Sequence, residues 1–88
     1  MPEVHKINDT SFEVTVTEAV ETRHKVHLSD KYHESLTANH ISKEDLITEA
    51  FKFLLARESN SMILREFDLK EIEKYFPGFP AEMKNRIK

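Results

Sequence analysis

The hydrophobic period of the chain changes at residue 28, and this change constrains the fold more than any other feature. Residues 12–17 alternate apolar and polar side chains, and residues 23–28 repeat the alternation, as half-buried strands do. The connection at residues 18–22 has a length that suits a hairpin. After residue 28 the apolar residues recur at helical spacing instead. Two strands followed by about four helices predict an α+β domain in which the helices cover one sheet face.

The strongest helical pattern covers residues 43–57. Its apolar positions recur at i, i+1, i+4, i+5, i+8 and i+9, and Ser42 with Asp45 forms a capping-box variant in front of it. This pattern predicts one long central amphipathic helix. A shorter helix is expected over residues 30–39, and two more over the segments that follow residues 68 and 80.

The chain length of 88 residues allows one small domain, residues 1–88. Within it, residues 1–11 are predicted to be flexible, residues 12–28 to form two strands, and residues 29–88 to be helical. The chain contains no run of about 18 apolar residues and its first residues contain no apolar stretch of signal-peptide type. A cytoplasmic protein without membrane contact is therefore expected.

The composition argues against catalysis and cofactors. The absence of cysteine excludes disulfides, thiolate zinc sites and cysteine nucleophiles, and the single glycine excludes a glycine-rich phosphate loop. No serine or carboxylate has a spacing that implies a nucleophile or an acid–base pair. We expect no enzymatic activity and no cofactor.

The five histidines are not expected to bind a metal ion. His24 and His27 are three residues apart on a predicted strand, which places them on opposite faces. His33 and His40 straddle a predicted helix end, and His5 stands alone. Solvated or capping roles are the favoured interpretation.

The net charge of −3 is unevenly distributed. Residues 1–22 contain one lysine and five acids, residues 23–57 carry a balance of +1, and residues 58–88 are neutral. On the second strand, Arg23, Lys25 and His27 share one face, whereas Val26 and Leu28 share the other with His24. The sequence thus places a small basic face beside an acidic first strand.

A strand with outward basic residues, a short helix, a turn and a long amphipathic helix follow one another over residues 23–57. The order resembles the ribbon-helix-helix family of Arc/MetJ-type DNA-binding proteins and antitoxins. The motifs that carry this resemblance are Lys25-Val26-His27-Leu28-Ser29, Ile41-Ser42-Lys43-Glu44-Asp45-Leu46-Ile47 and Ala50-Phe51.

This resemblance implies an obligate dimer whose paired strands enter the major groove of DNA. Arg23, Lys25 and His27 would then face the bases, while Ser42 and Lys43 would hold a backbone phosphate. Duplex DNA is the implied partner.

A second resemblance covers most of the chain. The phrases at residues 27–32, 63–69 and 75–77 are similar to small uncharacterised bacterial proteins, a resemblance that implies no site. The simplest interpretation of Arg23, Lys25 and His27 is the solvated face of a hairpin, opposite Glu13, Thr15 and Thr17.

We therefore predict a non-catalytic protein-interaction or regulatory module that binds an unknown protein or itself. A ribbon-type DNA-binding regulator is the alternative.

Two apolar segments leave their role open. Met62-Ile63-Leu64 fits a strand, a helix turn or an exposed anchor. The aromatic residues of the C-terminal part are expected to pack the last helices onto the central one, with an exposed protein-binding patch as the alternative. This group comprises Phe67, Tyr75, Phe76 and Phe79.

Overall fold

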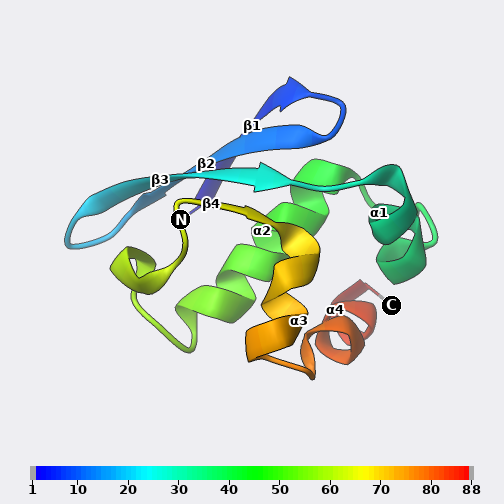
Figure 1. Cartoon of the computed structure of the whole chain (residues 1–88). Coiled ribbons are helices and arrows are strands. Elements are labelled where there is room, and N and C mark those ends of the chain that lie inside the picture. The colour runs from blue at the N-terminus through cyan, green and yellow to red at the C-terminus, as the bar shows by residue number, and fades with distance from the viewer. Residues whose placement is uncertain (1, 88) are drawn as a thin grey trace.

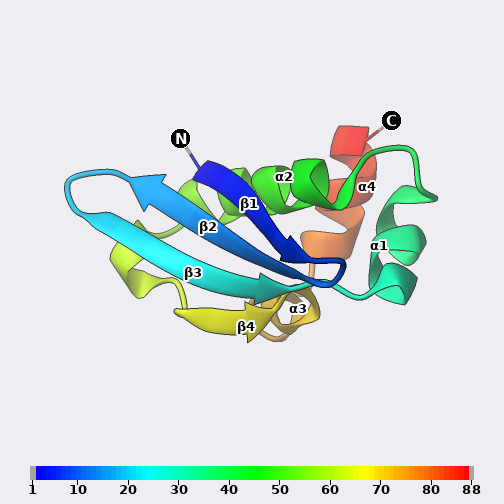
Figure 2. The same cartoon turned by 90° about the horizontal axis from the view of Figure 1, so that it is seen from above.

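The computed structural model describes residues 2–87, whose strands form one four-stranded sheet in the order β1-β2-β3-β4 (Figure 2). β1 (Pro2–Asn8) pairs antiparallel with β2 (Ser11–Thr17), and β2 pairs antiparallel with β3 (Glu21–His27). β4 (Glu66–Asp68) runs parallel to β3 on its other edge. The predicted α+β class is confirmed.

The alternation of β2 and β3 determines which side chains point inward. Val14 lies opposite His24, and Phe12 lies opposite Val26, so that these four residues share the buried face. A shift of one residue would expose all four, and the apolar pattern therefore specifies the register.

The helices lie on one side of the sheet (Figure 1). α1 (Asp30–Thr37) and α2 (Lys43–Leu55) follow β3, and the 3₁₀ turn η1 (Asn60–Met62) precedes β4. A second 3₁₀ turn, η2 (Leu69–Glu71), leads directly into α3 (Ile72–Tyr75), and α4 (Phe79–Ile87) ends the described chain. Ser29 and Ser42 cap α1 and α2 through their hydroxyl groups, as the sequence predicts.

The core lies between the inner sheet face and α2. Phe51 of α2 packs with its ring centre 5.4 Å from that of His24 and 6.2 Å from that of Phe67. Phe53 packs edge-on against Phe76 and Phe79 on the C-terminal side. One continuous apolar cluster therefore joins the sheet, α2 and the C-terminal helices.

Three predictions about the chain need correction. Residues 2–8, placed in the flexible start 1–11, form strand β1; this edge strand buries little, and it is positioned by pairing with β2 and not by a pattern of its own. Residues 29–88, predicted as helical, contain β4, whose three residues are too few to show a period. The helix predicted over residues 43–57 ends at Leu55.

Helix α1 ends at an alanine in the left-handed backbone conformation. Ala38 and Asn39 both have positive φ angles, of 50° and 62°. Asn tolerates this left-handed conformation, but the Cβ of alanine makes it unfavourable.

We expect Ala38→Gly to raise the free energy of unfolding by about 0.5–1 kcal/mol in urea denaturation. Ala81→Gly, at an exposed helical position of α4, should lower it by a similar amount. A loss of stability in Ala38→Gly would contradict the strain argument.

Candidate protein-binding groove

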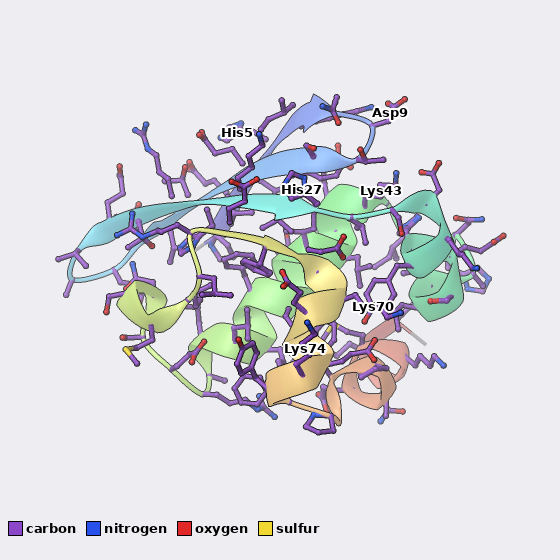
Figure 3. All side chains as sticks on the ribbon, viewed as in Figure 1. His5, Asp9, His27, Lys43, Lys70 and Lys74 are labelled. Atoms are coloured by element: carbon purple, nitrogen blue, oxygen red, sulfur yellow. The ribbon has the colours of Figure 1, made fainter. Side chains whose placement is uncertain are left out.

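The predicted basic residues of β3 lie on the outer sheet face, away from the helices. Arg23 and Lys25 are exposed, and His27 is half-buried. Figure 3 shows His27 projecting from this face, with His5 on the neighbouring part of the sheet. The inward and outward assignment of these side chains by the sequence pattern agrees with the structure.

Acidic side chains surround these basic residues. Lys25 lies between Glu13 of β2 and Glu66 of β4 in the register, and Arg23 pairs with Glu21 at 3.6 Å. The outer face is therefore mixed in charge, which weakens its attraction for a polyanion.

Ser42 and Lys43 are engaged in contacts within the chain. The Ser42 hydroxyl accepts the Asp45 N–H at 3.0 Å. The Lys43 ammonium donates to the Asp9 carbonyl at 2.5 Å and pairs with the Asp30 carboxylate, whose pKa is lowered chiefly by this hydrogen bond. Lys43 thereby joins the β1–β2 turn to α1 and α2 (Figure 3). Both side chains that the resemblance assigns to a backbone phosphate are therefore already paired within the chain.

His27 bridges two polar side chains on the sheet. Its Nδ1 lies 3.1 Å from the Ser11 Oγ, and its Nε2 lies 2.8 Å from the Glu66 carboxylate. The hydrogen bond from His27 is the main cause that lowers the pKa of Glu66. A hydroxyl, an imidazole and a carboxylate in a row are the groups of a hydrolytic triad. Here Ser11 is buried, and neither of the two hollows described below is lined by it. This chain of contacts joins β2, β3 and β4.

An apolar groove lies below the β4 edge of the sheet. Its volume is about 270 Å³, and eight of its ten lining residues are apolar. The lining residues are Leu54, Glu58, Met62, Ile63, Leu64, Phe67, Glu71, Ile72, Tyr75 and Phe76. Three of them expose large apolar side chains: Met62 at 70%, Leu64 at 49% and Tyr75 at 67%.

Three segments far apart in the sequence build this groove. Leu54 comes from the end of α2, residues 62–64 begin at the last residue of η1, and Tyr75 and Phe76 lie at the end of α3. The parallel pairing of β4 with β3 brings the last two segments to the same side of α2. Figure 1 shows β4 and α3 on the same side of the molecule, next to the C-terminal half of α2.

Buried hydrogen bonds hold one wall of the groove. The Nδ1–H of His24 donates to the Leu64 carbonyl at 2.7 Å, and its Nε2 lies 2.9 Å from the Thr22 hydroxyl. The Asn60 amide donates to that same hydroxyl at 3.0 Å and to the Val20 carbonyl at 2.8 Å. Residues 60–64 are therefore tied to β3 and to the β2–β3 loop.

A second, more open hollow lies beside α3. It has a volume of about 410 Å³ and is lined by charges of both signs, among them Lys70 and Lys74 (Figure 3). The Tyr32 hydroxyl donates to Glu73 at 2.5 Å, and burial is the main cause that raises the pKa of Tyr32. The mixed charges do not define one class of ligand.

Within residues 2–87, no three histidine or carboxylate side chains gather closely enough to hold a metal ion. No helix of this part of the chain has the length and apolarity needed to cross a membrane.

Comparison with known proteins gives no relative: no protein-family model, no curated protein and no solved structure matches the chain.

The sequence singled out parts of the groove without bringing them together. The sequence of Met62–Leu64 allows three roles, and the structure shows Met62 and Leu64 as exposed side chains around the buried Ile63. The core interpretation of the aromatic residues is right for Phe67 and Phe79, but Tyr75 is exposed. Nothing in the local sequence marks Glu58 and Glu71 as groove residues.

Proposed function

We propose that this chain is a small cytoplasmic, non-catalytic protein-interaction module that binds a partner protein through the apolar groove. The observation that carries the proposal is the gathering of Met62, Leu64 and Tyr75 around one hollow. A small domain gains stability by burying such side chains, so their joint exposure marks a surface that a partner covers.

The distribution of exposed apolar residues adds support. Among residues 2–87, five large apolar side chains are exposed, and three of them line the groove. The other two, Ile7 on β1 and Val20 in the β2–β3 loop, line neither hollow. Single exposed residues of this kind are ordinary, whereas a cluster is not.

The ribbon-type DNA-binding alternative has weaker support. It needs the strand with Arg23 and Lys25 to pair with the same strand of a second copy. In the structure β3 is flanked by β2 and β4, so both of its edges are used within one chain. We therefore favour protein binding over DNA binding.

A peptide-display selection against the purified chain tests the proposal. We expect Met62→Glu and Tyr75→Glu each to weaken binding of the selected peptides at least tenfold, because a carboxylate in the apolar contact must lose its water. Ile7→Glu is the matched control, since Ile7 is 54% exposed on the distant strand β1. Binding should be measured by fluorescence anisotropy, with circular dichroism to show that each variant is folded.

Two results would contradict the proposal. The selection could yield no peptide whose binding depends on Met62 or Tyr75. Alternatively, Ile7→Glu could reduce binding as strongly as the groove variants do.

A further inference from the structure

We infer that the groove takes a basic amphipathic helix of the partner protein, an inference that rests on the proposed function. Apolar side chains of that helix would fill the groove, and a lysine or arginine beside them would meet the carboxylates at its rim. The charges of the lining residues and the geometry of β4 lead to this assignment.

The charged groups of the groove are of one sign. Glu58 and Glu71 are its only charged lining residues, and both are half-buried. Within the described chain the Glu58 carboxylate makes no ion pair and no side-chain hydrogen bond. A partly desolvated carboxylate beside an apolar surface attracts a cation more strongly than one in bulk water.

Neighbouring residues hold this arrangement in place. The Glu71 carboxylate accepts the Asp68 N–H at 2.9 Å in the capping box of η2, which restricts its position. The closest basic residue in sequence, Arg57, is turned away: its guanidinium stacks 3.7 Å over the ring of Phe53 and donates to the Phe53 carbonyl. It therefore leaves Glu58 available to a cation of the partner.

The short edge strand favours a helix over an added strand. β4 has three residues, and its Asp68 N–H already donates to Glu71. Strand addition depends on a row of free backbone groups, and this edge provides few of them. An amphipathic helix needs only apolar anchors and a complementary rim, which the groove provides.

Three displayed peptide libraries test the inference. Two contain amphipathic helices with the same randomised apolar anchors, flanked by lysine and arginine in one and by glutamate and aspartate in the other. The third contains extended, proline-rich peptides. The strongest binders are then measured against the wild-type chain, Glu58→Gln, Glu71→Gln, and the control Glu3→Gln on β1.

We expect the basic helical library to give the strongest binders. Their affinity should fall about three- to fivefold in Glu58→Gln and should weaken with added salt. Glu71→Gln should have a similar effect, because glutamine removes the charge but still caps η2. Glu3→Gln should change nothing.

The possible failures can be distinguished. Two results would overturn this inference and leave the proposed function standing. One is a set of groove-dependent binders from the acidic or extended library. The other is a set of binders whose affinity is unchanged in both glutamine variants. If no library yields a binder whose affinity depends on Met62, both this inference and the proposed function are overturned.

Discussion

Replacing Asn60 with alanine is expected to lower the free energy of unfolding by about 2–3 kcal/mol, because the buried Thr22 hydroxyl and the partly buried Val20 carbonyl lose their donor. The Asn60 amide donates to the Val20 carbonyl at 2.8 Å and to the Thr22 hydroxyl at 3.0 Å, and the residue is only 3% exposed. Asn60→Asp should destabilise at least as much, since a carboxylate has the same shape but cannot donate to the Val20 carbonyl. Urea denaturation followed by circular dichroism measures both variants.

The control for this pair is Asn85→Ala, at an exposed position of α4, which should stay within about 0.5 kcal/mol of the wild type. Hydrogen exchange should also show faster opening of residues 60–64 in Asn60→Ala, because Asn60 joins this groove wall to the sheet. Stability of Asn60→Asp equal to that of the wild type would show that the hydrogen bonds contribute nothing.

The second large effect is a loss of stability at acidic pH that depends on His24. Burial is the main cause that lowers the pKa of His24, and the nearby Arg65 charge adds to it, whereas the hydrogen bond to the Leu64 carbonyl acts in the opposite direction. The Leu64 carbonyl can only accept, so Nδ1 carries the proton of the neutral ring and Nε2 accepts from Thr22.

The sign of the effect follows from this lowered pKa. As the pH falls through the ordinary range of histidine, near 6.5, the unfolded chain binds a proton before folded His24 does. The contribution of His24 to stability is therefore complete above that range and decreases as the pH falls toward the folded pKa. Peptide affinity should fall over the same range, because His24 holds Leu64 at the groove.

Urea denaturation at a series of pH values from 7.5 to 5 measures this dependence. The slope of stability against pH should be smaller in His24→Gln, which cannot titrate, than in the wild type. His40→Gln, which replaces an exposed histidine on the α1–α2 connection, is the matched control substitution. Equal slopes in the wild type and in His24→Gln would contradict the assignment of this acid sensitivity to His24.

Local patterns were enough to predict the centre of the fold. The alternation at residues 12–17 and 23–28 indicates both inner strands and their buried faces, and the capped amphipathic pattern at residue 42 indicates the helix that carries the core. Both patterns are repeated over several residues and depend on burial by nearby neighbours.

The edges of the sheet and the groove could not be predicted in this way. β1 and β4 are positioned by pairing with strands that already face the core, and β4 joins β3 across about 40 residues of sequence. The groove depends on that pairing, because it brings Met62 and Leu64 to the same hollow as Tyr75. The charges of Arg23, Lys25 and Lys43 were visible in the sequence, but the acids that surround them come from other elements.

The most direct test of the groove as a binding surface is amide chemical-shift mapping of the isotope-labelled chain with the strongest peptide from the basic helical library. The proposed function predicts that the largest shifts lie at residues 58–67 and 71–76 and that they disappear in Met62→Glu. Largest shifts on the outer sheet face, around Arg23 and Lys25, would contradict it.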